Sequence, residues 1–223
     1  VNDFAALQKD SKIFEINDGL FKAVSERGIC KVICFSPDHS KSLADMEVVA
    51  IDKVIKAWQK EYTLLGENEM IAYVQIFENK GAVMGCSNPH PHGQIWSQST
   101  LPNEVQKKDT HQSIYYAKNK RSLLGDYLEQ EQKTNERIIY ENDDFVVLVP
   151  FWAIWPFETM IVPKKKYKDI TQLSDSESLS FAEAISAITK AYDKLFDCSF
   201  PYSSGIHQAP TNNKSNEHWH WHM

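Results

Sequence analysis

The sequence predicts an α+β protein made of two related halves, with mostly antiparallel sheet and flanking helices. Long amphipathic helical patterns alternate with short β-type runs, and three motifs recur in the same order. The pairs are NDFAAL with NDDFVVL, SPDHSKSL with VPKKKYKDITQL, and HPHGQIW with HWHWHM. Because the offset between copies is nearly constant, from His39 to Tyr167 and from His92 to His222, the pattern indicates duplication of one unit.

Two segments have the apolar spacing of long helices, residues 43–65 and residues 175–196. Each follows a serine N-cap with an acidic residue three positions on, Ser42 with Asp45 and Ser174 with Glu177. Strands are predicted at residues 29–35, 71–77, 93–97, 138–140, 145–150, 158–162 and 218–223. The polar stretch 107–133 is predicted to be partly helical. We therefore divide the chain into an N-terminal half at 1–106, a connecting segment at 107–137 and a C-terminal half at 138–223.

Composition excludes several classes of function. The chain of 223 residues is 42% hydrophobic and 24% charged, which is typical of a globular protein with a core. Its net charge of −6 argues against binding nucleic acid or an anionic membrane surface. No apolar run approaches the roughly 18 residues of a membrane helix. The opening VNDFAALQKD has no signal-peptide pattern, so we expect a cytoplasmic protein, and both ends look like cuts in a longer chain.

The segment NPHPHGQIW places two histidines in a fixed relation. Prolines follow Asn88 and His90, and a residue before proline is pushed into extended conformations. In an extended chain alternate side chains share a face, so His90, His92 and Gln94 are expected to point the same way. Gly93 is expected to leave room for a ligand beside the backbone. Since a neutral imidazole is available at physiological pH, the row suits attack on a phosphate group.

A loop rich in small residues, GAVMGCS, precedes the histidine strand. Gly81 and Gly85 permit turns and a close approach of the backbone to a ligand. Asn79 and Ser87 supply hydrogen-bonding groups for a phosphate or a sugar. The loop and the strand together predict a phosphate-bearing ligand.

The run ENKGAVMGCSNPHPHGQIW resembles the active-site signature of the galactose-1-phosphate uridylyltransferase family, a branch of the histidine-triad superfamily. NDFAAL, CFSPDHSKSL, VPFWAIWPFET, YDKLFDCSFPYSSGIHQAP and HWHWHM resemble the family in the same order, so the likeness covers essentially the whole chain. It implies a duplicated unit of the histidine-triad type. It also implies a cytoplasmic homodimer that exchanges uridylyl groups between UDP-glucose and galactose 1-phosphate.

The resemblance also implies roles for individual residues. His92 is the expected nucleophile, which attacks the α-phosphorus of UDP-glucose, releases glucose 1-phosphate and holds a uridylyl-imidazole intermediate. Galactose 1-phosphate then takes the uridylyl group to give UDP-galactose. Gln94 is expected to bond the transferred phosphoryl oxygens. Contacts with the nucleotide sugar are implied for Asn2, Asp3, Asn79, Gly85, Cys86, Ser87 and Gln94.

Two metal sites are implied in the same way. His39 and His90 resemble two ligands of a structural zinc site, whose other ligands are expected before residue 1. His207 and His222 resemble two ligands of a second site, of iron type or a second zinc, with a third histidine expected beyond the last residue. The family's carboxylate ligand falls on Lys108, a cation that cannot bind a metal.

Several alternatives are left open. Asp109 or Glu104 could replace that carboxylate, or the second site could be altered. HWHWHM could instead be an alternating strand with Trp219 and Trp221 in the core and its histidines facing solvent. The rival functions are a histidine-triad nucleotide hydrolase or phosphorylase, and a non-catalytic, metal-stabilised UDP-sugar-binding protein. Gln94 argues against the hydrolase, which usually carries a third histidine there. We expect the fragment alone to be weakly active or inactive.

Overall fold

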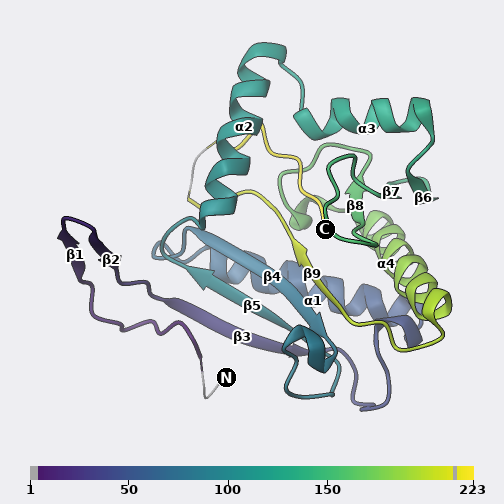
Figure 1. Ribbon diagram of the computed structural model, residues 1–223, viewed down its shortest axis with the longest axis horizontal. Helices are drawn as coiled ribbons and strands as arrows, with labels where there is room; N and C mark the ends of the chain where they lie inside the picture. The colour runs from purple at the N-terminus through teal and green to yellow at the C-terminus, as the bar shows by residue number, and fades with distance from the viewer. Residues whose placement is uncertain (1–4, 213–214) are drawn as a thin grey trace.

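The computed structural model describes residues 5–212 and 215–223, and its largest sheet has four strands in the order β3-β5-β4-β9 (Figure 1). They are β3 (Gly28–Cys34), β4 (Tyr73–Lys80), β5 (His92–Gln98) and β9 (Tyr202–Ile206). All neighbouring pairs are antiparallel. The first three agree with the strands predicted from alternating apolar residues. β9 was not predicted, and it brings a strand of the C-terminal half into the sheet of the N-terminal half.

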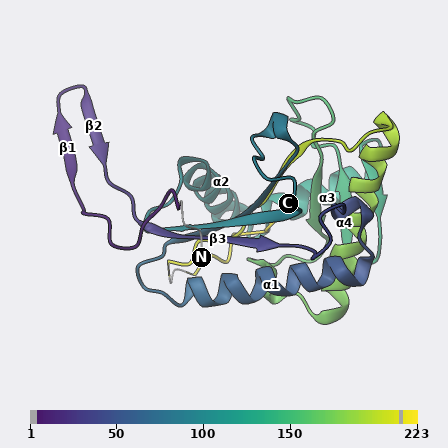
Figure 2. The ribbon, with the colours of Figure 1, turned by 90° about the horizontal axis from the view of Figure 1, so that it is seen from below.

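Helix α1 (Val48–Gly66) covers one face of this sheet (Figure 2). Ile76 of β4 and Ile95 of β5 belong to the same buried cluster as Trp58 of the helix. The predicted helix at 43–65 is wrong in its first turn. Residues Leu43–Asp45 form a separate 3-10 turn with the Ser42–Asp45 capping box, and Met46 then adopts an extended backbone (φ −85°, ψ 145°) that ends it.

Helix α4 (Asp175–Phe196) has the predicted bounds, and its Ser174–Glu177 capping box is present. It packs against α1, so the two long helices lie together in one core. Phe181 contributes its ring to an aromatic cluster with Phe145 and Trp221, with ring centroids 5.0 to 5.9 Å apart. This cluster joins α4 to the second sheet.

The second sheet has the order β6-β7-β8 and is also antiparallel. Its strands are β6 (Ile138–Glu141), β7 (Phe145–Leu148) and β8 (Met160–Pro163), close to the predicted ranges. Helices α2 (Asn103–Asn119) and α3 (Leu123–Thr134) occupy the segment predicted to be partly helical. Leu124 and Leu128 of α3 pack on Val146 and Val162, so α3 and α4 lie on opposite faces of this sheet. The α+β class with antiparallel sheets is therefore confirmed.

The last residues of the chain join the two sheets. His222 and His207 exchange two backbone hydrogen bonds, of 2.8 and 3.0 Å, and Met223 exchanges two with Ile161 of β8. The strand predicted at 218–223 is otherwise wrong, because the backbone turns at Asn216, whose carbonyl accepts from the N–H of Trp219.

Both alternating faces of this terminal segment are covered. Trp219 and Trp221 are buried as the alternative interpretation of HWHWHM expected, but His220 between them is also fully buried. Its Nε2 atom lies 2.8 Å from the Pro163 carbonyl, and its Nδ1 atom lies 3.1 Å from Ser122 Oγ at the start of α3. The expectation that these histidines all face solvent is therefore wrong.

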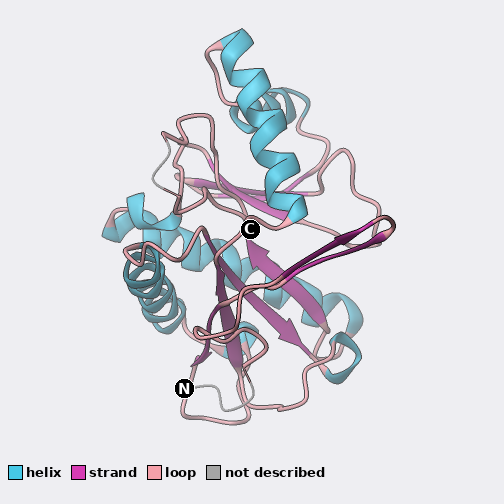
Figure 3. Cartoon of the chain, turned by 90° about the vertical axis from the view of Figure 1, so that its left-hand side faces the viewer, coloured by secondary structure: helices cyan, strands magenta, loops and turns pink. Residues whose placement is uncertain are grey.

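A hairpin of β1 (Glu15–Asp18) and β2 (Phe21–Val24) projects from the body of the molecule (Figure 3). Every residue of both strands is exposed, and Gly19 has a φ of 56° in the turn. The hairpin was not predicted, although Asp-Gly is a common hairpin turn. Within residues 5–212 and 215–223, no helix is long and apolar enough to cross a membrane.

Candidate active site

His92 opens β5 with its side chain half-buried, and its ring orientation is fixed by the backbone two residues earlier. The Nδ1 atom lies 2.7 Å from the carbonyl oxygen of His90. A carbonyl oxygen only accepts hydrogen bonds, so Nδ1 carries the ring proton and donates it. In the neutral ring the lone pair therefore sits on Nε2, the atom that a nucleophile must present.

A cavity of about 370 Å³ lies at this end of the sheet. Among the residues that line it are six of those predicted from the sequence: His39, Asn79, Cys86, Ser87, His90 and His92. They come from the loop after β3, the end of β4, the loop that leads into β5 and the first residue of β5. Residues scattered over the N-terminal half are thus brought to one place.

The small-residue loop turns where its glycines allow. Gly81 and Gly85 have φ values of 93° and 82°, which side chains rarely permit, and a 3-10 turn lies between them. A Cβ atom on Gly81 would also lie 2.9 Å from Pro201 Cβ. Hence the turns predicted for both glycines are confirmed, and Gly81 additionally allows close packing under the loop.

Two polar residues beside the cavity, Cys86 in the loop and Asn79 at the end of β4, are hydrogen-bonded to neighbours. Cys86 donates its thiol to the Asn88 carbonyl at 3.0 Å, and Asn79 Oδ1 accepts from Ser203 Oγ at 2.7 Å. Ser87 is exposed on the rim of the cavity. Asn2 and Asp3 lie outside the described residues.

Gln94 shares a strand face with His92, as alternation predicts, while His90 lies before the strand. Trp96 Nε1 donates to Gln94 Oε1 at 3.1 Å, so the amide oxygen is occupied and its NH₂ group is the part offered to a ligand. Among described residues, the lining of the cavity reaches His92 but not Gln94. The carboxamide therefore lies next to the cavity, further along the strand.

The Cβ position of Gly93 faces the core, so the expectation that this glycine leaves room for a ligand is wrong. It is buried, and a Cβ atom there would lie 2.8 Å from Phe35 Cζ and 3.1 Å from the Phe77 carbonyl oxygen. The glycine makes room for a phenylalanine ring below the nucleophile.

His39 and His90 face each other across the mouth of the cavity, with their Nδ1 atoms 2.8 Å apart. Two nitrogen ligands of a tetrahedral zinc ion lie about 3.3 Å apart, so a small opening of the pair would admit the metal. Within the described part of the chain, no group of three or more His, Cys, Asp or Glu side chains is arranged to hold a metal ion. The pair thus fits half of a zinc site.

The second histidine pair has a different neighbour. The rings of His207 and His222 stack at 5.0 Å with an interplanar angle of 23°, and Lys108 Nζ lies 3.2 Å from His222 Nε2. Burial lowers the pKa of His207 to about 3 and that of Lys108 to about 8, and it lowers the pKa of His222 well below its usual range.

The candidate replacement carboxylates are engaged elsewhere. Asp109 Oδ1 accepts from His218 Nε2 and Trp219 Nε1, each at 2.7 Å, and Glu104 pairs with Lys107 on the exposed side of α2. Neither contacts the His207–His222 pair, so the residues present do not fit a metal site there.

Sequence reasoning missed a buried carboxyl group behind the active site. Glu78 is 5% exposed and accepts a 2.8 Å hydrogen bond from Tyr202 of β9. Burial raises the pKa of Glu78 to about 7, although the Tyr202 hydroxyl and the Lys80 ammonium favour the charged form. The pattern of β4 contained the signal, since Glu78 falls on the same strand face as the core residue Ile76.

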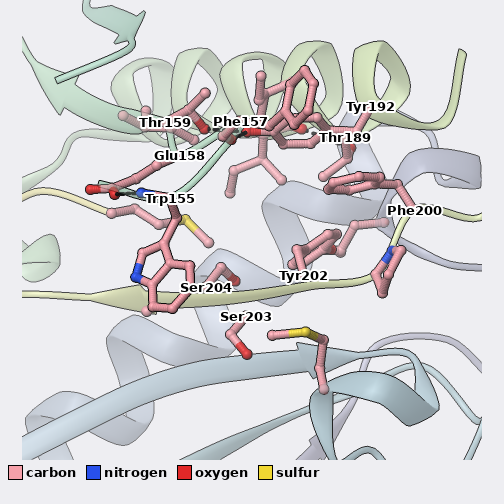
Figure 4. A pocket seen from close by; sticks show the side chains of 18 of the residues that line it. Trp155, Phe157, Glu158, Thr159, Thr189, Tyr192, Phe200, Tyr202, Ser203 and Ser204 are labelled. Atoms are coloured by element: carbon pink, nitrogen blue, oxygen red, sulfur yellow. Dashed lines mark hydrogen bonds between the residues drawn. The ribbon is translucent and has the colours of Figure 1, made fainter. Parts of the chain in front are cut away.

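A larger cavity of about 570 Å³ lies between β9 and α4 (Figure 4). Its wall is mostly apolar and includes the aromatic side chains of Trp155, Phe157, Tyr192, Phe200 and Tyr202. Tyr192 ties the wall together, because its hydroxyl bonds Thr159 Oγ1 and the Phe157 carbonyl. Of the predicted site residues that the structure describes, only His207 lines this cavity, so the cavity is separate from the site of the nucleophile.

Comparisons with known proteins identify the same family over nearly the whole chain. Residues 1–102 match the family described as galactose-1-phosphate uridyl transferase, N-terminal domain, and residues 107–223 match its C-terminal domain. A galactose-1-phosphate uridylyltransferase of Haemophilus influenzae is 50% identical over 222 residues, which is 99% of this chain and 63% of that protein. A probable enzyme of the same name from Drosophila melanogaster is 46% identical, over 99% of this chain and 64% of that protein. The chain thus spans less than two thirds of the length of both relatives.

Solved structures give the same result. A uridylyltransferase structure superposes with a TM-score of 0.90 at 28% identity, covering 99% of this chain and 70% of that one. An ADP-glucose phosphorylase from Arabidopsis thaliana with bound ADP-glucose superposes with a TM-score of 0.80 at 26% identity, covering 88% and 61%. The fold is therefore shared with a uridylyltransferase and with an ADP-glucose phosphorylase.

Proposed function

The chain belongs to the galactose-1-phosphate uridylyltransferase family, and from this premise we propose that it carries the nucleophile of such an enzyme. The proposed reaction transfers UMP from UDP-glucose to galactose 1-phosphate and yields UDP-galactose and glucose 1-phosphate. The observation that supports it best is the 2.7 Å contact from His92 Nδ1 to the His90 carbonyl, which leaves Nε2 free to attack phosphorus.

The transfer takes two displacements at one phosphorus atom. In the first, the Nε2 lone pair forms a bond to the α-phosphorus, and the bond from that phosphorus to the bridging oxygen breaks. Glucose 1-phosphate leaves with the electron pair. In the second, a phosphate oxygen of galactose 1-phosphate attacks the same phosphorus and the P–N bond breaks. The phosphorylated imidazole carries a positive charge. In both steps its Nδ1–H group donates a hydrogen bond to the His90 carbonyl oxygen, and this bond stabilises the charged ring.

Neighbouring groups bind the substrate in this proposal. The Gln94 amide donates to a non-bridging oxygen of the transferred group, and Ser87 and Asn79 contact the nucleotide sugar from the rim of the cavity. Gly85 and Cys86 shape the loop beneath it. Asn2 and Asp3 are assigned to the nucleotide from the family resemblance alone.

A structural zinc ion is part of the proposal. His39 and His90 would supply two nitrogen ligands, and the remaining ligands would come from a part of the protein outside this chain. Such an ion would fasten the loop after β3 to the residue whose carbonyl orients His92. It would supply no step of the chemistry.

We further propose that the protein works as a homodimer in the cytoplasm. Large apolar side chains are exposed at many positions of the described surface, and two groups of them are close together in sequence, on and beside the β1–β2 hairpin and in the aromatic loop at 151–157. They include Phe14, Leu20, Phe21, Phe151, Ile154 and Trp155. A two-stranded ribbon is marginally stable in water by itself, and clustered exposed apolar groups mark interaction surfaces. A second copy of the chain would cover them.

Intact-mass spectrometry of the full-length protein tests the function. After mixing with UDP-glucose alone, we expect a mass gain of one uridylyl group, which galactose 1-phosphate removes. The His92→Ala variant should show no mass gain. The control His111→Ala, which changes an exposed residue of α2, should gain the same mass as wild type. UDP-glucose bound without adduct would favour a binding protein, and steady release of UMP to water would favour a hydrolase.

A further inference from the structure

Lys108 of α2 lies against the His207–His222 bridge, the backbone pairing that joins the end of the chain to the sheets. Its Nζ atom is 3.2 Å from His222 Nε2, and His222 is held to His207 by two backbone hydrogen bonds and a stacked ring. The cavity beside it, of about 490 Å³, is lined mostly by apolar side chains such as Leu124, Trp152 and Met160, and Lys107, His111 and Glu158 also line it. In such an environment a hydrogen bond from an ammonium group is stronger than in water.

The same contact excludes a metal ion from His222. A zinc or iron ion bound to Nε2 would lie about 2.0 to 2.1 Å from it, on the side that Lys108 Nζ occupies. An ammonium group has three donors and no lone pair, so it repels the ion instead of binding it. Within residues 5–212 and 215–223, no third metal-binding side chain is grouped with the pair.

Nitrogen atoms that can bind a metal ion are nonetheless present. The Nδ1 atoms of both His207 and His222 are buried and have no hydrogen-bond partner within the described part of the chain. Leaving such a group unpaired destabilises the folded protein, so the two rings are not arranged for stability alone. What keeps this pair from binding a metal is the residue at 108, which places a cation beside the rings where a third ligand would be needed.

We propose that the ammonium group of Lys108 replaces a metal ion here, as an internal cation that fastens α2 to the His207–His222 bridge. The pair accordingly binds no divalent metal, and the identity of the residue at 108 decides this. With a carboxylate at that position the site would hold two imidazoles and one carboxylate, a set that suits iron or zinc.

Metal binding by the full-length protein tests the proposal, with Co²⁺ as the probe and metal content and visible absorption as the readouts. Wild type and His222→Ala should bind equal amounts of Co²⁺, because any ion at His39 and His90 is unaffected by the change. The Lys108→Glu variant should gain one further equivalent, and adding His222→Ala should remove it. The matched control Lys108→Met should gain none and should unfold at a lower temperature than wild type.

Two results would overturn the proposal. Loss of one equivalent of Co²⁺ from the wild type on His222→Ala would mean that the pair binds metal despite the lysine. A folded Lys108→Glu protein without extra Co²⁺ would mean that the charge at 108 does not decide occupancy. If Lys108→Glu does not fold, the comparison of wild type with His222→Ala is sufficient. None of these results depends on the proposed transfer reaction.

Discussion

The Nδ1 atom of His92 lies 2.7 Å from the carbonyl oxygen of His90, while the ring of the same His90 lies against His39. One residue thus acts on two neighbours through different groups. Its backbone carbonyl orients the nucleophile, and its imidazole faces the candidate zinc position. Because a side-chain substitution leaves the carbonyl in place, the two roles are separable by mutation.

The His90→Ala variant should therefore lose zinc but keep the nucleophile. We expect its zinc content to fall and its melting temperature to drop by about 2 to 4 °C for each kcal/mol of binding energy lost. The uridylyl adduct should still form, at a rate reduced less than about tenfold, since the hydrogen bond to His92 is retained. Metal analysis, thermal unfolding and intact mass on one sample check this. His92→Ala should give the opposite pattern, and an adduct lost from His90→Ala with zinc retained would contradict the separation.

The Gln94→Leu variant should slow adduct formation by about 10- to 100-fold, because a hydrogen bond to a charged oxygen contributes roughly 1.5 to 3 kcal/mol. Gln94→Glu should be slower still, since a carboxylate repels the phosphate oxygens. Rapid-quench measurement of the adduct gives both rates. The control is Gln98→Leu, on the same face of β5 but further from His92, which should react at the wild-type rate. Equal rates for Gln94→Leu and Gln98→Leu would remove Gln94 from the proposed site.

The Gly93→Ala variant should be less stable by about 1 to 3 kcal/mol, as expected for overpacking in a core. Its new Cβ atom would lie 2.8 Å from Phe35 Cζ, closer than real contacts allow. Thermal unfolding measures the loss, and Phe35→Leu in the same chain should recover part of it. The comparison variant is Gly125→Ala in helix α3, where the nearest atom is 3.4 Å away and the stability should not fall.

The parts of the fold that were predictable are those fixed by nearby residues. The bounds of α4 follow from its capping box and apolar stripe, and β3, β4 and β5 follow from alternation. β9 has the sequence YSSGI, which lacks a clear strand pattern, and pairing with β4 holds it in the sheet. Its position depends on a partner far away in the chain.

In the candidate site, too, the features set by nearby residues were predictable and those set by distant contacts were not. Alternation was sufficient to expect His92 and Gln94 on one strand face, and glycine turns were expected at Gly81 and Gly85. His90, which the prolines were expected to hold in the same row, instead lies in a bend before the strand. The ring proton of His92 depends on a carbonyl that no residue pattern reveals. The packing of Phe35 under Gly93 is also a tertiary contact, which is why the glycine was misinterpreted.

The exposed hairpin leads to a prediction about assembly. The Phe21→Ser variant should shift the full-length protein from dimer toward monomer, because Phe21 is 77% exposed and burying it would contribute roughly 1.5 to 3 kcal/mol. Sedimentation velocity over a range of concentrations measures the shift. The control is Lys22→Ser on the same hairpin, which changes a charged side chain and should leave the dimer intact. A monomeric wild type would remove the homodimer from the proposal.

The buried Glu78 makes stability depend on pH. Its pKa is raised from the usual 4.5 to about 7, so the folded protein favours the protonated form. As pH rises through this window, the unfolded chain loses the proton first and the folded state loses stability, with the full penalty present above about pH 7. The Glu78→Gln variant keeps an acceptor for Tyr202 and carries no charge. It should match wild type near about pH 4.5 and exceed it by about 1 to 3 kcal/mol near pH 8. Denaturant unfolding at several pH values measures the difference, with the exposed Glu69→Gln as control. A constant difference across the range would mean that Glu78 does not titrate there.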